Sequence, residues 1–183
     1  MIFTDVSFTT WCWIIGLIHL LLGVAMLVGR GRTADAFKRF PRSAIAGVGL
    51  STLAFLWAAV IIHVAPLDII APYKTQGVIL LLFFIPASWF WMGDLLAARA
   101  LGGLLCLLPA PVLLATRFLD SEWRLVMVVL MYVYAVAGMF FAGMPYLCRD
   151  AITWITARPK RFAAAGVVSL LIGLLVIILP ALV

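Results

Sequence analysis

The long apolar runs of this sequence contain almost no charge. Charged residues make up 11% of the 183 residues, and glutamate occurs once, at Glu122. No Asp, Glu, Lys or Arg lies in the central part of any apolar run. Proton-coupled carriers, voltage sensors and ion pumps need ionisable side chains at membrane depth. The lack of such side chains argues against coupled transport and leaves neutral channels and polar-lined facilitators open.

Motifs for catalytic and metal chemistry are missing as well. Cys12, Cys106 and Cys148 have no metal-ligand spacing, so we expect free thiols. No serine, cysteine or histidine constellation indicates a nucleophile, and neither a glycine-rich phosphate loop nor an HExxH zinc motif occurs. We therefore predict no catalytic residue, no metal site and no cofactor. The N-terminus also lacks the basic start and the cleavage site of a removable signal peptide, so the first apolar run should persist.

Apolar residues, in contrast, are abundant enough to define the class of protein. They make up 67% of the chain, and the mean hydropathy is +1.24. A soluble globule of this size cannot bury so much apolar surface, whereas about 20 mostly apolar residues form a helix that spans a bilayer. Long unbroken runs favour helices over barrel strands, which alternate polar and apolar residues. The predicted fold class is all-α, a polytopic membrane helix bundle with six transmembrane helices and short loops in one domain. The predicted spans are 10–28, 44–64, 77–92, 100–116, 125–147 and 162–182.

The third and fourth predicted spans are short and contain proline. Pro86 lies in the third, and Pro109 and Pro111 lie in the fourth. Two readings stay open, namely two full crossings or one re-entrant hairpin. Broken helices expose backbone groups that a solute can satisfy, so these two spans are the best candidate for a binding cavity, which Tyr132 or Tyr134 of the next span could reach.

The polar connections carry most of the basic residues. In the segment 29–43 we expect Gly29 and Gly31 to end the first span, a short surface helix to follow, and Pro41 to end that helix. We expect the segment 148–161 to be a basic loop. The basic residues on one side of the predicted topology are Arg30, Arg32, Lys38, Arg39, Arg42, Arg99, Arg149, Arg158, Lys160 and Arg161. Those on the other side are Lys74, Arg117 and Arg124.

This charge bias predicts the orientation. Basic residues in short loops favour the cytoplasmic side, so we expect both termini to lie outside the cytoplasm, in a cell membrane of the inner or plasma type. Anionic lipid headgroups at the cytoplasmic face then account for the net charge of +6. Membrane lipids are therefore expected partners, and nucleic acid is not.

Two histidines lie in the apolar runs. A b-type haem would need two imidazoles that face each other at one depth. Counted from the outer helix ends, His19 lies about 12 Å deep and His63 only a few Å deep, at about 1.5 Å per residue. The depths match poorly. We expect a neutral His19 that hydrogen-bonds a neighbouring helix and a His63 that reaches headgroup water.

Asp94 and Arg99 are the most suggestive pair on the basic side. One carboxylate cannot hold the two divalent ions of lipid phosphotransfer chemistry, so a lipid-modifying enzyme is only the third hypothesis. The first is a non-catalytic component that packs in a homo-oligomer or with a partner membrane subunit. Its expected interface consists of small residues that allow close approach, namely Gly47, Ser51, Gly138 and Ala142. The second is a small-solute facilitator or channel that uses the two proline-containing spans.

Overall fold

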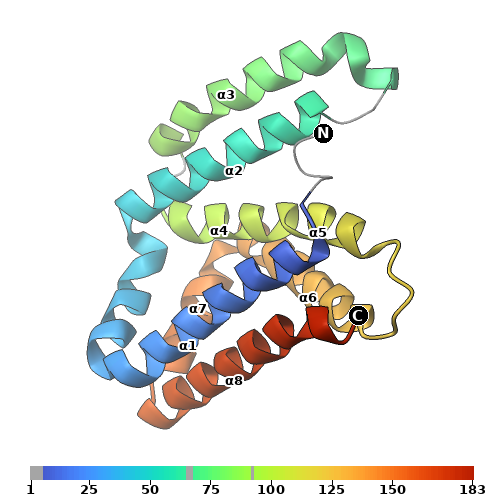
Figure 1. The fold of residues 1–183 in the computed structure, drawn as a ribbon. Coiled ribbons are helices and arrows are strands. Elements are labelled where there is room, and N and C mark those ends of the chain that lie inside the picture. Colours follow the sequence, from blue (N-terminus) through green and yellow to red (C-terminus); the bar gives the residue numbers. More distant parts are fainter. Residues whose placement is uncertain (1–5, 65–67, 92) are drawn as a thin grey trace.

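The computed structural model describes residues 6–64, 68–91 and 93–183, and within these ranges the regular structure is entirely helical. The elements are α1 (Phe8–Arg39), η1 (Phe40–Arg42), α2 (Ala44–Val64), η2 (Asp68–Tyr73), α3 (Lys74–Trp91), α4 (Leu96–Leu107), α5 (Pro109–Thr116), α6 (Arg124–Gly143), α7 (Pro145–Thr156), α8 (Pro159–Ile178) and η3 (Leu179–Ala181). The all-α fold predicted from the sequence is confirmed (Figure 1).

Six helical stretches are long and apolar enough to cross a bilayer. They are Phe8–Gly29, Ala44–Val64, Ala71–Trp91, Leu96–Thr116, Arg124–Gly143 and Pro159–Ala181. The third and fourth stretches have 21 residues each, so both have the length of a full crossing, which the predicted ranges 77–92 and 100–116 understated. Pro109 stands at the first position of α5, where its missing N–H costs nothing, and α5 continues the fourth stretch beyond α4. The fold is that of a multi-pass membrane protein.

Helix α1 continues through the two glycines that we expected to end it. The hydroxyl of Thr33 donates a hydrogen bond to the carbonyl of Ala25 over 2.9 Å. These residues are eight apart, which corresponds to about 12 Å along a straight helix, so the axis of α1 bends sharply between them. A Cβ on Gly29 would collide with the Thr33 hydroxyl, so the missing side chain makes room for the bend. As predicted, α1 ends just before Pro41.

The fifth span is shorter than predicted. Helix α6 ends at Gly143 instead of continuing to residue 147, and α7 begins at Pro145. Proline favours the first position of a helix, and Met144 leaves the helical region with φ −127° and ψ 71°. Most of the predicted basic loop 148–161 is therefore the helix α7. This helix buries Cys148 and exposes Asp150, Thr153 and Trp154.

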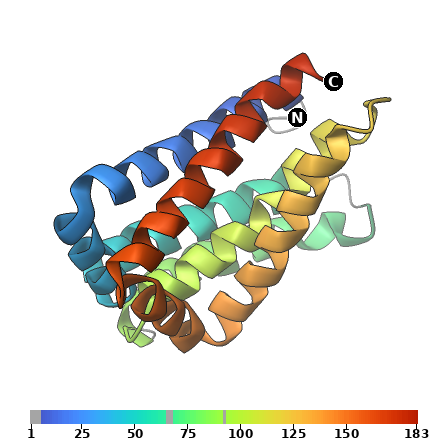
Figure 2. The same ribbon diagram turned by 90° about the horizontal axis from the view of Figure 1, so that it is seen from below.

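The helices form two groups. In the first, α1 and α8 run antiparallel along their length (Figure 2). In the second, α2 lies between α3 and α4, and α4 packs on α6 (Figure 1). A core of buried side chains from α1, α5, α6, α8 and η3 joins the groups: Trp11, Cys12, Ile15, Val112, Met127, Met131, Val176 and Leu179.

One end of the bundle carries most of the basic residues. At this end α1 finishes, α2, α4 and α8 begin, and α7 lies across the helix ends. We call it the basic end, and its residues are Arg32, Lys38, Arg39, Arg42, Arg99, Arg149, Arg158, Lys160 and Arg161. The start of α1 and the end of η3 lie at the opposite end (Figure 2).

Candidate functional site

His19 of α1 lies in a cluster of polar side chains within the spanning part of the bundle. Its ring atom Nδ1 is 3.1 Å from the hydroxyl oxygen of Ser169 on α8, and its Nε2 hydrogen-bonds the hydroxyl of Tyr134 on α6. The rings of His19 and Tyr134 stack with centroids 6.0 Å apart. We call His19, Tyr134 and Ser169 the polar cluster. It connects three spanning helices, and His19 makes the interhelical hydrogen bonds expected from the sequence.

The hydrogen bonds fix the tautomer of His19. The hydroxyl of Ser169 has one hydrogen, which it donates to the backbone carbonyl of His19 over 2.8 Å. The Ser169 oxygen must therefore accept a hydrogen from Nδ1 of His19. In a neutral ring Nε2 then accepts, so the hydroxyl of Tyr134 donates to it. Every donor in the polar cluster is used within it, and the network closes on the His19 backbone.

Four glycines hold α1 and α8 together on either side of the polar cluster. Gly16 and Gly23 of α1 are seven residues apart, as are Gly166 and Gly173 of α8. A Cβ on Gly173 would lie 2.9 Å from the backbone oxygen of Gly16, and one on Gly23 would lie 2.8 Å from that of Gly166. The two backbones therefore approach too closely for any side chain at these points. These four glycines were not among the small residues predicted to form an interface, although their matched seven-residue spacing is visible in the sequence.

His63 lies apart from the polar cluster. It is exposed and stands one residue from the end of α2, whereas His19 lies in the middle of the first spanning stretch. Both ring nitrogens of His19 already have protein partners. Neither is open to a haem iron, so the geometry gives no support to a histidine-ligated cofactor. In the described part of the chain, no three His, Cys, Asp or Glu residues gather as they would around a metal ion.

Asp94 and Arg99 lie at the basic end, around the turn between α3 and α4. Together with Trp91 and Gly93 they line an open hollow of about 570 Å³. Asp94 is exposed, and Arg99 is half-buried with its Nη1 3.5 Å from the carbonyl of Ala142 near the end of α6. A cation beside a helix C-terminus is stabilising. Of the residues described, none hydrogen-bonds the buried Nε of Arg99, and no ion pair joins Arg99 to Asp94. Arg99 thus contacts the end of α6 rather than Asp94.

The two proline-containing spans do not form a packed pair. Helix α2 lies between α3 and α4, so the arrangement gives no support to a cavity between them (Figure 1). Pro86 is exposed on α3, whereas Pro109 is buried at the start of α5. On α6 it is Tyr134 that joins the polar cluster, while Tyr132 is exposed to 62%.

The small residues expected to form an interface are used between helices of this chain. Gly47 packs on Leu96 and Ala97 of α4, and buried Ser51 accepts a hydrogen bond from the Trp89 indole of α3 over 3.2 Å. A Cβ on Gly138 would lie 2.7 Å from the backbone oxygen of Gly102, and a Cβ on Gly102 would collide with the backbone of Ala142. All four predicted positions allow close packing, but their partners are intramolecular.

Six candidate spans, a closed polar cluster and glycine-packed interfaces define the class of an all-helical, multi-pass membrane protein. No protein-family model matches the chain, and neither a curated protein nor a solved structure shows significant similarity to it.

Proposed function

We propose that this protein is a non-catalytic component of a cell membrane assembly, and that α3 is the helix that packs against the neighbouring subunit. The observation that carries this proposal is the position of α3. Of the described elements, only α2 and η2 pack substantially on α3. A spanning helix with one helical neighbour leaves most of its surface outside the fold of its own chain.

The outward face of α3 is large and aromatic. It includes Phe83, which is exposed to 60%, and Phe90, which is exposed to 84%. Because Gly47, Ser51, Gly138 and Ala142 are engaged within the chain, an assembly needs a different surface. Helices in a bilayer associate through van der Waals packing, for which a broad face of rigid side chains is suited. The occupant that we propose is a spanning helix of a neighbouring subunit, in the simplest case a second copy of this chain.

The closed polar cluster supports a role without chemistry. Its hydroxyl and imidazole hydrogens are all donated within the cluster, so it has no donor left for a substrate. The backbones of α1 and α8 meet at glycines, so sliding one helix along the other would bring larger side chains against those backbones. A component that holds a fixed shape fits both features better than a carrier that must change conformation.

The proposed orientation follows from charge. Nine of the described basic residues lie at the basic end, against Lys74, Arg117 and Arg124 at the other. We place the basic end in the cytoplasm and both termini outside it, in an inner or plasma membrane.

Photo-crosslinking in native membranes tests the assembly. A benzophenone amino acid replaces Phe83 on α3, and in a matched control it replaces Leu171 on α8, which is exposed to 61%. We expect a protein adduct from position 83 and mainly lipid adducts from position 171, with mass spectrometry showing whether the adduct is a second copy. Lipid adducts alone at position 83, or equal protein adducts at both positions, would contradict the proposal. Solute flux through proteoliposomes of the purified protein would favour a facilitator instead.

A further inference from the structure

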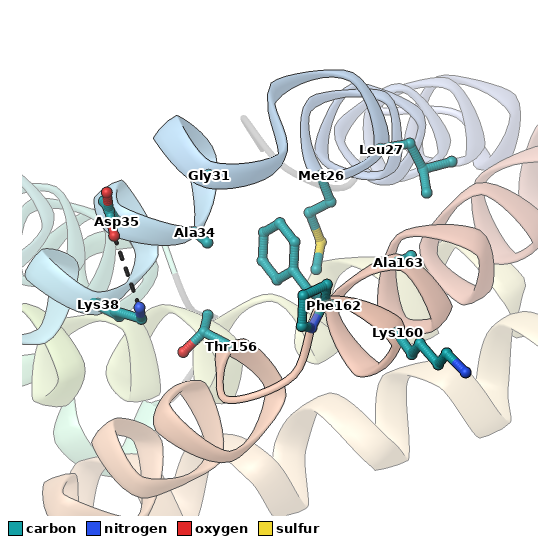
Figure 3. Close-up of a pocket in the computed structure, with 11 residues that line it drawn as sticks. Met26, Leu27, Gly31, Ala34, Asp35, Lys38, Thr156, Lys160, Phe162 and Ala163 are labelled. Atoms are coloured by element: carbon teal, nitrogen blue, oxygen red, sulfur yellow. Dashed lines mark ion pairs between the residues drawn. The ribbon is translucent and has the colours of Figure 1, made fainter.

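A hollow of about 690 Å³ opens at the basic end, between the bent end of α1 and the start of α8 (Figure 3). Its lining comes from the end of α1, from α7 and from the start of α8, and it includes Met26, Asp35 and Lys38 of α1 and Lys160, Phe162 and Ala163 of α8. The volume is within the range of small-molecule sites in proteins. Neither the polar cluster nor the α3 face includes any of these residues.

The bend in α1 creates this hollow. The Thr33 hydroxyl donates a hydrogen bond back to the carbonyl of Ala25. Beyond this bend, α1 no longer runs parallel to the axis of α8. Phe37, beyond the bend, packs edge-on against Phe162 of α8 with ring centroids 5.9 Å apart. This contact holds the turned segment against α8 on one side, and the hollow remains between them.

The hollow crosses the boundary of the spanning segments. Its floor includes Met26, exposed to 6%, and Phe162, exposed to 4%, and both lie inside the spanning stretches Phe8–Gly29 and Pro159–Ala181. Asp35 and Lys38 lie beyond the end of the first stretch. Lys160 is the second residue of the last stretch, where a lysine side chain can extend to the headgroups, so an apolar floor within the membrane and a charged rim at its edge match the two ends of an amphiphile.

The rim is positively charged overall. Lys38 and Lys160 lie on opposite sides of the apolar floor (Figure 3). The one acidic residue of the lining, Asp35, pairs with Lys38 over 3.7 Å, and both side chains of this pair are at least half exposed. Arg158 stands directly before α8 and is exposed. An ammonium group on a flexible stem serves as a point charge for a phosphate oxygen, so the rim fits a phosphate ester.

From these features we infer that the hollow binds one anionic phospholipid, with its headgroup at the rim that carries Lys38 and Lys160 and an acyl chain along Met26 and Phe162. The apolar floor distinguishes this ligand from free phosphate. The positive rim distinguishes it from a zwitterionic lipid, whose choline group gains nothing from lysine. The inference does not depend on the assembly through α3.

Native mass spectrometry of the detergent-solubilised protein tests the inference, with phosphatidylglycerol and phosphatidylcholine of identical acyl chains as probes. A basic side chain near anionic lipid contributes an affinity factor of about fivefold, so Lys38→Gln together with Lys160→Gln should weaken phosphatidylglycerol binding about twenty-five-fold. Arg42→Gln removes an exposed charge at the same end but outside the hollow, and should change binding less than about twofold.

Two further variants distinguish a specific effect on lipid binding from misfolding of the protein. Asp35→Asn removes the acid that competes for Lys38, so it should strengthen phosphatidylglycerol binding, a change that misfolding cannot produce. Ala163→Phe fills the hollow without changing charge and should reduce lipid retention. Equal binding of both lipids to the unmodified protein, undiminished binding after the double lysine substitution, or competition by millimolar inorganic phosphate as strong as that by phosphatidylglycerol would overturn the inference.

Discussion

Removing the hydroxyl of Tyr134 tests whether the polar cluster stabilises the bundle. Tyr134→Phe keeps the ring but takes away the hydrogen that Nε2 of His19 accepts. Tyr132→Phe is the matched control, since the same change is made two residues away on an exposed side chain. If the network is as the structure shows, the first substitution destabilises the protein and the second does not.

The expected loss of stability follows from the number of hydrogen bonds that each substitution removes. A hydrogen bond between membrane helices contributes on average about 0.6 and at most about 1.7 kcal/mol. Tyr134→Phe removes one such bond, so its cost should lie in that range. Ser169→Ala removes two bonds and leaves Nδ1–H of His19 buried without an acceptor, which raises the expected cost to about 1 to 3 kcal/mol.

A double-mutant cycle isolates the interaction between the two rings. The free energy of unfolding is measured by titration with sodium dodecyl sulfate in mixed micelles for His19→Leu, for Tyr134→Phe and for the double variant. We expect the two substitutions to be coupled by about 1 kcal/mol, because each removes the same hydrogen bond. Additive effects, or a loss in Tyr132→Phe equal to that in Tyr134→Phe, would refute the network.

Two further predictions concern packing and thiol reactivity. Gly102→Ala should lower the free energy of unfolding by about 1 to 3 kcal/mol, because the new Cβ collides with the backbone of α6. The control Gly49→Ala adds a Cβ with nothing within 4 Å and should be neutral or stabilising. Equal effects of the two substitutions would show that α4 and α6 are not so close. Burial raises the pKa of the Cys148 thiol on α7, so less thiolate forms at a given pH, and its alkylation at pH 8 should be much slower in the folded protein than after denaturation. In a variant with Cys148→Ala, an introduced Asp150→Cys should react fast in both states, and equally fast labelling of native Cys148 would contradict its burial.

Composition and run length were enough to predict the number of spans, because the bilayer sets the same length for every crossing. The predicted ends of the spans were less accurate where a single residue or hydrogen bond determines where a helix ends. The predicted fifth span, 125–147, includes Pro145, although proline at a first helical position marks the start of a new helix, and that helix is α7. Gly29 and Gly31 were read as the end of α1, but a hydrogen bond from Thr33 carries the helix around the bend.

The pairing of helices could not be predicted in the same way. Small residues indicated that Gly47, Ser51, Gly138 and Ala142 allow close approach, but every spanning helix meets the same apolar surroundings, so composition does not select the partner. The structure shows that the partners belong to the same chain. For the candidate site, His19 was singled out correctly as an interhelical hydrogen-bonding residue. Ser169 and Tyr134 were not assigned to it, because their distance in sequence, 150 and 115 residues, hides the contact.

The antiparallel pairing of α1 with α8 also has a consequence for biosynthesis. Helix α1 is synthesised long before α8, the helix along which it packs, whereas α2 and α3 are consecutive and can associate as soon as both are inserted. Until α8 is made, His19 and the glycine surface around it face lipid or an insertion factor instead of their native neighbour. Synthesis of α8 is therefore the event that allows this part of the bundle to close, and a chain that stops before residue 159 lacks the helix that closes it.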